Sequence, residues 1–196
     1  NKINTHFNKL LKTEGRDFVI AIDTDSMYIT LELLIKQVYG DSINTKTRAE
    51  IVEFVDKVAR QKIEPFIDRG YQELADYMSA YDQKMKMKRE AIADRGIWTG
   101  KKHYILNVYD LEGVRYKEPK LKIQGIESVR SSTPATCREH LKEAFAIIMN
   151  ENEQALQKFI KNYRKEYKAL PFEDIAFPRS VRGLPVSYTH LTLPTI

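Results

Sequence analysis

Residues 18–30 read Phe-Val-Ile-Ala-Ile-Asp-Thr-Asp-Ser-Met-Tyr-Ile-Thr. Apolar and β-branched residues stand on both sides of the polar stretch Asp23-Thr24-Asp25-Ser26, which favours two short strands joined by a tight turn. Carboxylates two positions apart on such a turn project close together, and carboxylate oxygens are ligands that Mg²⁺ prefers. Asp side chains also close turns for purely structural reasons, by bonding to nearby backbone. The stretch therefore predicts a β-hairpin and leaves its chemistry open.

Helical patterns flank this hairpin on both sides. Apolar residues at helical spacing from Ile3 to Leu11 predict an opening helix that Gly15 closes. A short helix is expected over 31–39. Thr47 is followed three residues later by an acid, which is a capping-box pattern at the start of a further helix. Pro65 is expected to end or kink that helix.

The second half of the chain alternates first and turns helical later. Residues 84–93 have period two, which predicts a strand. Further strands are expected over 102–109 and 114–117, joined by a hairpin turn, and over 120–126. Pro134 is expected as the first residue of a helix that runs to about residue 149, and a second helix follows over about 153–168. These patterns predict an α+β fold: an antiparallel sheet with helices, then a helical pair.

Composition excludes several classes of protein. The chain has 196 residues, of which 42% are hydrophobic and 30% charged, as in an ordinary globular protein. Apolar runs such as Phe18–Ile22 are far too short to cross a bilayer, so we expect no membrane partner. Cys137 is the only cysteine, which excludes an internal disulfide and a cysteine-based zinc site. The four histidines have no metal-ligand spacing.

Positive charge is concentrated in the middle of the chain. The net charge is +5, yet residues 84–130 alone hold twelve Lys or Arg against six acids. A basic segment between nearly neutral ends suggests that one region grips an anionic partner. The alternative is a solvated strand face without a partner.

From the sequence we expect that the chain is truncated at both ends. It begins at Asn1 without an initiator Met, and no secretory signal follows. Residues 184–196 contain no Asp, Glu, Lys or Arg, in sharp contrast to the charged chain before them. We expect a non-native tail over 184–196, such as translated vector sequence; a native apolar strand is the alternative.

Residues 23–26, 88–93, 101–104 and 120–134 are four segments that, in this order, resemble motifs of the family B DNA polymerases, in particular those of T-even-type bacteriophages. Asp23-Thr24-Asp25-Ser26 is similar to the family's catalytic hairpin, and residues 88–93 (Lys-Arg-Glu-Ala-Ile-Ala) to the palm strand that carries an accessory carboxylate. Residues 101–104 (Lys-Lys-His-Tyr) are similar to its Lys-Lys-x-Tyr motif. Residues 120–134 resemble the passage from palm to thumb. The resemblance covers about residues 2–183 and is specific because the four motifs keep their order.

The resemblance implies a role for each matching residue. Asp25 would ligate two Mg²⁺ ions with Asp23 in a weaker ligand role, and Glu90 would be the third carboxylate of the catalytic set. A second ligand set would come from an upstream region. Residues that would bind DNA share positive charge or polarity: Lys101, Lys102, Tyr104, Lys122, Arg130 and Ser131.

The resemblance also implies a fold and an activity. The fold would be a palm-type antiparallel sheet with packed helices over residues 1–130, followed by the beginning of a helical thumb over 131–183, as a fragment of a larger polymerase. The activity would be DNA-directed DNA polymerisation on primer–template DNA with deoxynucleoside triphosphates, by a two-metal reaction. We expect the fragment alone to be inactive.

For the full-length protein the resemblance implies a phage enzyme in the host cytoplasm, with a sliding clamp and replisome proteins as partners. The alternative function is a non-catalytic nucleic-acid-binding module that uses the basic sheet and keeps the Asp turn only for structure. Another palm-type nucleotidyltransferase, such as an RNA polymerase, fits the Lys-Lys-x-Tyr and palm-to-thumb motifs less well.

Overall fold

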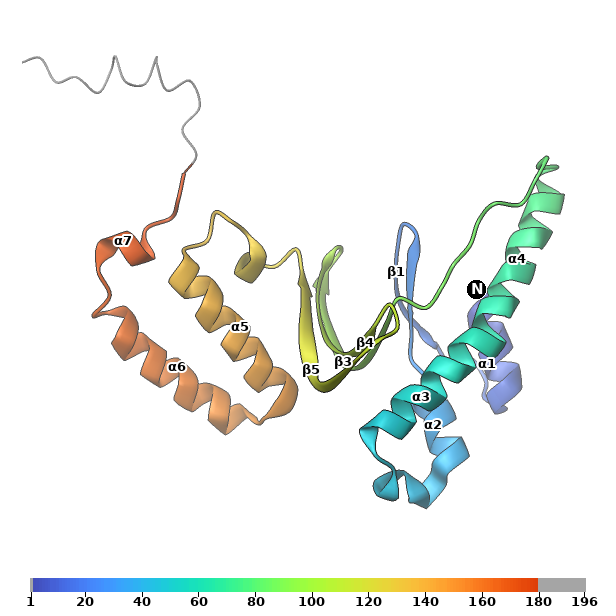
Figure 1. Cartoon of the computed structure of the whole chain (residues 1–196), viewed down its shortest axis with the longest axis horizontal. Coiled ribbons are helices and arrows are strands. Elements are labelled where there is room, and N and C mark those ends of the chain that lie inside the picture. Colours follow the sequence, from blue (N-terminus) through green and yellow to red (C-terminus); the bar gives the residue numbers. More distant parts are fainter. Residues whose placement is uncertain (1, 180–196) are drawn as a thin grey trace, which may run out of the picture. The chain divides into compact units, whose positions relative to one another are not determined.

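A computed structural model describes residues 2–179 (Figure 1). It confirms the α+β fold, with one two-stranded and one three-stranded antiparallel sheet. Two compact units divide the chain. One comprises the residues up to Ile97 together with Leu106–Lys122, and the other comprises Trp98–Ile105 and the chain from Ile123 on. The predicted domain boundaries at 130 and 183 stay a prediction, and the predicted tail over 184–196 lies outside the described residues.

Helix α1 (Lys2–Leu11) buries one face, as its apolar spacing predicts. Ile3, Phe7 and Leu11 pack with Phe18 into the core of the first unit. The helix ends before the predicted Gly15. The side chain of Asn8 folds back, accepting hydrogen bonds from the Thr13 hydroxyl at 2.7 Å and the Arg16 amide at 3.1 Å. Lys12 has a left-handed φ of 53°, and the Thr13 amide donates to the Asn8 carbonyl at 2.9 Å, so the backbone closes the helix before Gly15.

The predicted hairpin is present. Strands β1 (Val19–Asp23) and β2 (Ser26–Ile29) pair in antiparallel fashion with Asp23 opposite Ser26, so that the turn holds only Thr24 and Asp25. Met27 and Ile29 pack against the α1 core. The short helix α2 (Glu32–Tyr39) follows and leads into a 3₁₀ turn over Gly40–Thr45. The hairpin thus rests on a buried base while its tip is free to carry polar groups.

Helix α3 (Arg48–Val58) begins with the predicted capping box. The Thr47 hydroxyl accepts from the amide of Glu50, whose carboxylate accepts from the amide of Thr47 at 2.8 Å. Hydrogen bonds from the Thr47 backbone, the Lys46 side chain and the Thr47 hydroxyl lower the pKa of Glu50 to about 2.

Pro65 neither ends the helix nor leaves it regular. The α-helix widens into a π-turn over Ala59–Ile63 and continues as α4 (Glu64–Tyr77). Proline lacks the amide hydrogen and its ring clashes with the carbonyl four residues earlier. A π-turn directly before it moves that carbonyl away, so the chain stays helical at the cost of a local irregularity.

The second sheet is built from β3 (Ala91–Gly100), β4 (His103–Leu111) and β5 (Val114–Gln124) in that order. The prediction of a strand from residue 84 was wrong, because residues 84–90 have no regular secondary structure and β3 begins only at Ala91. The two short strands predicted over 114–117 and 120–126 are one strand. Pro119 is tolerated within β5 because this strand lies at the edge of the sheet.

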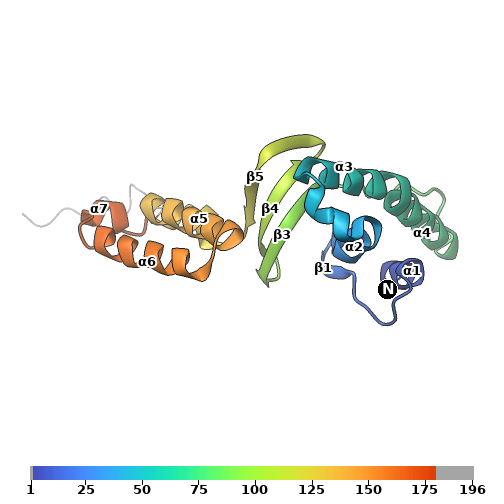
Figure 2. The same ribbon diagram turned by 90° about the horizontal axis from the view of Figure 1, so that it is seen from below.

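Helices close the described chain. Helix α5 (Ala135–Asn150) begins one residue later than predicted, with Pro134 as its N-cap. Asn152 caps helix α6 (Glu153–Tyr167) by accepting from an amide at 3.0 Å. The two helices lie side by side, and the short α7 (Phe172–Ile175) follows (Figure 2). The helical pair predicted after residue 133 is therefore confirmed.

Candidate functional site

The tip of the β1–β2 hairpin presents two carboxylates. Asp25 is exposed, whereas Asp23 is partly buried and accepts a hydrogen bond from the Thr24 hydroxyl at 3.1 Å. Thr24 has a φ of 54°, which is rare for a β-branched residue and strained. The Ser26 hydroxyl donates to the Asp23 carbonyl at 3.1 Å and tightens the turn. A strained, two-residue turn is a feature often kept for function, since Gly or Asn would fill it more easily.

Glu90 lies directly before β3 and is exposed. Its carboxylate pairs with the ammonium group of Lys122 on β5, so two of the predicted site residues are in contact. The amide of Glu112 donates to the Glu90 carbonyl at 2.6 Å and holds the backbone. The family resemblance predicts a carboxylate near the metals and a separate phosphate-binding lysine, whereas the two side chains form one ion pair.

The oxygen ligands of the hairpin fit part of a divalent cation site. Asp23 and Asp25 offer hard oxygen ligands from one turn, of the kind that Mg²⁺ prefers. Within residues 2–179, no three His, Cys, Asp or Glu side chains gather into a group that could hold a metal ion. Two of the expected ligands thus share one turn, and any complete site requires further groups.

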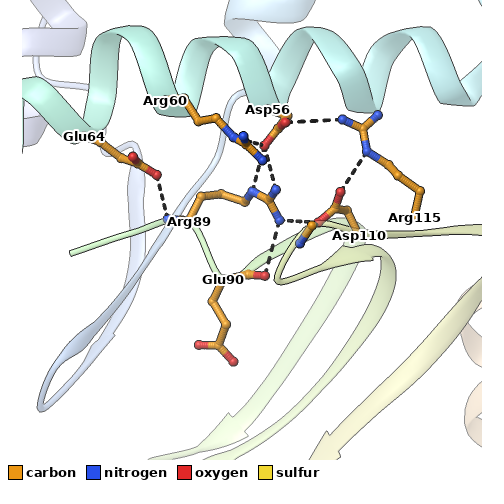
Figure 3. Close-up of polar contacts among 8 residues, drawn as sticks. Asp56, Arg60, Glu64, Arg89, Glu90, Asp110 and Arg115 are labelled. Carbon is orange, nitrogen blue, oxygen red and sulfur yellow. Dashed lines mark hydrogen bonds and ion pairs between the residues drawn. The ribbon is translucent and has the colours of Figure 1, made fainter. Parts of the chain in front are cut away.

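A charge cluster that the sequence patterns did not indicate lies beside Glu90 (Figure 3). The Arg89 guanidinium donates to Asp56 on α3, with Nη2 at 2.6 Å from Oδ1, and pairs with Asp110 at the end of β4. Asp110 is fully buried and also accepts from Arg115 Nε at 2.8 Å. Burial opposes the charge of Asp56, but the hydrogen bonds and charges of Arg89 and Arg60 prevail and lower its pKa.

A pocket of about 510 Å³ opens next to this cluster. Its lining mixes both signs of charge and includes the predicted acid Glu90. The lining residues are Arg60, Glu64, Lys88, Arg89, Glu90, Glu112 and Gly113. A charged ligand in this pocket would meet both donors and acceptors.

The predicted DNA-binding lysines form a hairpin tip. Lys101 and Lys102 are the two turn residues between β3 and β4 and are exposed, and Lys102 has a left-handed φ of 62°. Tyr104, two residues on, is buried instead. Its hydroxyl donates to Gln124 Oε1 on β5 at 2.7 Å. The tyrosine ring is thus part of the packing beneath the tip, and the lysines are its accessible charges.

Arg130 reaches the same hairpin tip from the chain after β5. Its Nη2 donates to the Gly125 carbonyl at 3.1 Å and lies 3.4 Å from His103 Nε2. Gly125 has a φ of +72°, and a Cβ there would collide with the Lys102 carbonyl and the His103 ring. The end of β5 therefore lies directly against the turn, and the exposed Arg130 contacts His103, the residue that follows the two lysines. Ser131 is exposed next to it.

Two of the histidines and the single cysteine contact aromatic side chains. His6 stacks on Phe66 with ring centroids 4.2 Å apart, and His140 stacks on Tyr163 at 4.1 Å. The Tyr163 hydroxyl donates to Cys137 Sγ at 3.5 Å. Burial, together with Cys137, raises the pKa of this tyrosine.

Membrane-spanning helices do not occur in the part of the chain that the structure describes. Over residues 2–179, none of the helices has both the length and the apolarity needed to cross a bilayer.

Known proteins match nearly the whole chain. The family model "Divergent Family B DNA polymerase" matches residues 8–169. A DNA-directed DNA polymerase of Enterobacteria phage T4 is 42% identical over 183 residues, which are 89% of this chain and 20% of that protein. A DNA-directed DNA polymerase of Escherichia phage RB69 is 42% identical over 191 residues, 93% of this chain and 21% of that protein. The chain spans about a fifth of the length of these curated relatives.

Proposed function

This chain belongs to the divergent family B DNA polymerases, and from that premise we propose that it is the part of a replicative DNA-directed DNA polymerase that joins the palm to the thumb. The full-length enzyme adds deoxynucleotides to the 3′ end of a primer on a DNA template. The observation that carries this proposal is the family match over residues 8–169, because that range contains every predicted site residue. Identity of 42% to two phage DNA polymerases supports it.

In this proposal the β1–β2 turn supplies metal ligands. Asp25 is the principal ligand of two Mg²⁺ ions and Asp23 a weaker one, and the other ligands come from an upstream part of the full-length chain. When bound, the divalent ions would supply the neutralisation of charge that phosphoryl transfer needs. The exposed position of Asp25 at the tip of a tight turn supports this role. Glu90 is the third acid, with Lys122 as its counter-charge.

The second set of residues holds the primer–template duplex. Lys101 and Lys102 at the β3–β4 turn and Arg130 beside them bind phosphates of the primer strand near its end. The exposure of the two lysines and the contact of Arg130 with the neighbouring His103 support this role, because phosphate contacts position nucleic acid independently of sequence. Tyr104 supports the tip from below, and Ser131 continues the contact toward the thumb.

Partners and setting follow from the relatives. We propose primer–template DNA and deoxynucleoside triphosphates as substrates, and a sliding clamp and replisome proteins as partners of the full-length enzyme. Since both relatives named above come from bacteriophages, the place of action is the cytoplasm of the infected host. The 196-residue chain by itself is inactive, because it supplies only part of the metal ligands.

A non-catalytic nucleic-acid-binding module is the alternative, and one experiment separates the two functions. In the full-length polymerase, Asp25→Ala removes the principal metal ligand, whereas Lys102→Ala removes one phosphate contact. A polymerase loses the rate of single-turnover nucleotide addition with the first variant and primer–template affinity with the second. If Asp25→Ala extends primers at the normal rate, the catalytic role of the turn is wrong.

A further inference from the structure

Arg89 stands one residue before Glu90 and is the centre of the charge cluster in Figure 3. Its side chain is only 9% exposed, and Nε and Nη2 both bond Oδ1 of Asp56, at 3.0 and 2.6 Å. Its Nη1 pairs with the fully buried Asp110. A buried ion pair adds little net stability over apolar packing, because each charge loses its water. A buried ion pair does, however, fix geometry. Here it holds the backbone of residue 89 in place against helix α3 and the end of β4.

Three further contacts transmit this geometry to Glu90. The Arg89 amide donates to Glu64 Oε1 at 2.9 Å, and the Glu112 amide donates to the Glu90 carbonyl at 2.6 Å. The Arg89 guanidinium lies 3.4 Å from the same carbonyl. Strand β3 begins only at Ala91, so these contacts take the place of a strand partner for the two residues before it. The Glu90 side chain points away from the cluster (Figure 3). Its carboxylate pairs with Lys122.

We infer that Arg89 is a positioning residue for Glu90. By pairing with Asp56 and Asp110 it fixes the point at which the chain enters β3, and it thereby aims the Glu90 carboxylate. This inference rests on the proposed function, since Arg89 affects the reaction only through the part that Glu90 has in it. Nothing in the local sequence pattern marks Arg89, whose two acidic partners lie 33 and 21 residues away.

A double-mutant cycle in the full-length polymerase tests this role. The cycle compares Arg89→Lys, Glu90→Gln and the double variant, in single-turnover nucleotide addition at saturating primer–template and deoxynucleotide. Lysine keeps the positive charge but lacks the planar guanidinium, whose several N–H donors bond two carboxylates at once. We expect Arg89→Lys to slow addition by about 10- to 100-fold, as misplacement of a reacting group does, with unchanged affinity for primer–template. When Glu90→Gln is already present, adding Arg89→Lys should lower the rate of addition by less than about twofold.

Arg60→Lys is the matched control. Arg60 pairs with the same carboxylate, Asp56, at 3.2 Å, but its side chain is 60% exposed and has no contact with the Glu90 backbone among those described. We expect this variant to stay within about twofold of the wild-type rate, as exposed ion pairs contribute little. If the cluster had a purely structural role, Arg89→Lys would instead lower the midpoint of urea unfolding. It would also change the rate of addition by the same factor with and without Glu90→Gln.

The outcomes separate this inference from the proposed function. If Arg89→Lys slows addition by the same factor on both backgrounds, or weakens primer–template binding in place of the rate, the positioning role is overturned. If Glu90→Gln alone leaves the rate unchanged, the proposed role of Glu90 fails and the inference fails with it. Should Arg89→Lys not fold, Asp56→Asn takes its place in the cycle, because it removes one charge from the same guanidinium while keeping the side-chain shape.

Discussion

Replacing Gly125 by alanine probes how the phosphate-binding tip is built. Gly125 has a φ of +72°, which costs an L-residue about 1–2 kcal/mol. A Cβ there would also collide with the His103 ring and with the Lys102 carbonyl, which belongs to the backbone and cannot swing away like a side chain. Relief of such overpacking costs about 1–3 kcal/mol more. Together the two effects predict that Gly125→Ala lowers the free energy of unfolding by about 2–5 kcal/mol.

The same substitution should weaken DNA binding. The Gly125 carbonyl accepts the hydrogen bond of Arg130, so that a displaced backbone moves the arginine away from the lysine turn. Loss of one charge-assisted contact predicts a drop of about tenfold in primer–template affinity. Gly15→Ala is the control, because Gly15 has a similar φ of +63° but no other atom lies within 4 Å of the point that a Cβ would occupy. Gly15→Ala should lower the free energy of unfolding by only about 1–2 kcal/mol and leave DNA binding unchanged.

Urea unfolding and anisotropy titration of labelled primer–template, both on the full-length polymerase, measure the two effects. Equal destabilisation by Gly125→Ala and Gly15→Ala would show that the backbone after β5 does not press on the turn. Normal DNA affinity for Gly125→Ala would show that Arg130 does not depend on this contact. Either result would refute the described packing of the tip.

Charged residues supply three more expected outcomes. Asp110→Ala should cost about 3–5 kcal/mol in urea unfolding, because it strips a buried partner from Arg89, whereas Arg60→Ala should cost under about 1 kcal/mol. Hydrogen bonds at the N-cap lower the pKa of Glu50 from 4.5 to about 2, so its stabilising effect is complete above pH 4.5 and is lost as the pH falls toward 2. Comparing acid unfolding with Glu50→Gln, which lacks this step, checks the sign. Lys102→Ala should lower the slope of log affinity against log salt by about one phosphate contact, and an unchanged slope would remove this lysine from the DNA interface.

Local patterns predicted the parts of the fold that depend on local contacts. The β1–β2 hairpin, the capping box at Thr47 and the pair α5–α6 all depend on residues a few positions apart, and the structure confirms them. The strand predicted over 84–93 was wrong up to Glu90, although its alternation is regular. Period two indicates that a segment can pair, but pairing needs a neighbouring strand, and residues 89–90 bond a helix carboxylate and a turn instead.

The candidate site also has parts that the sequence predicts and parts that it does not. The resemblance to family motifs indicated Asp25 and Lys102, and each of them occupies a two-residue turn. No sequence pattern indicated the Asp56–Arg89–Asp110 cluster, because its members come from separate elements. Gly125 could have been found, since a glycine at the end of a strand is a known mark of close backbone approach. Its neighbour in space, the turn at Lys102, could not have been named without the register of the sheet.

The most direct test of the central claim is a rapid-quench measurement of one nucleotide addition by the full-length polymerase carrying Asp25→Asn. Asp41→Asn is the matched control, an exposed acid within the 3₁₀ turn of the same unit. If Asp25 is the principal metal ligand, its variant should be slower by about a thousandfold or more while it binds primer–template normally, and the control should keep the wild-type rate. Addition at the wild-type rate by Asp25→Asn would contradict the metal-binding role of the turn.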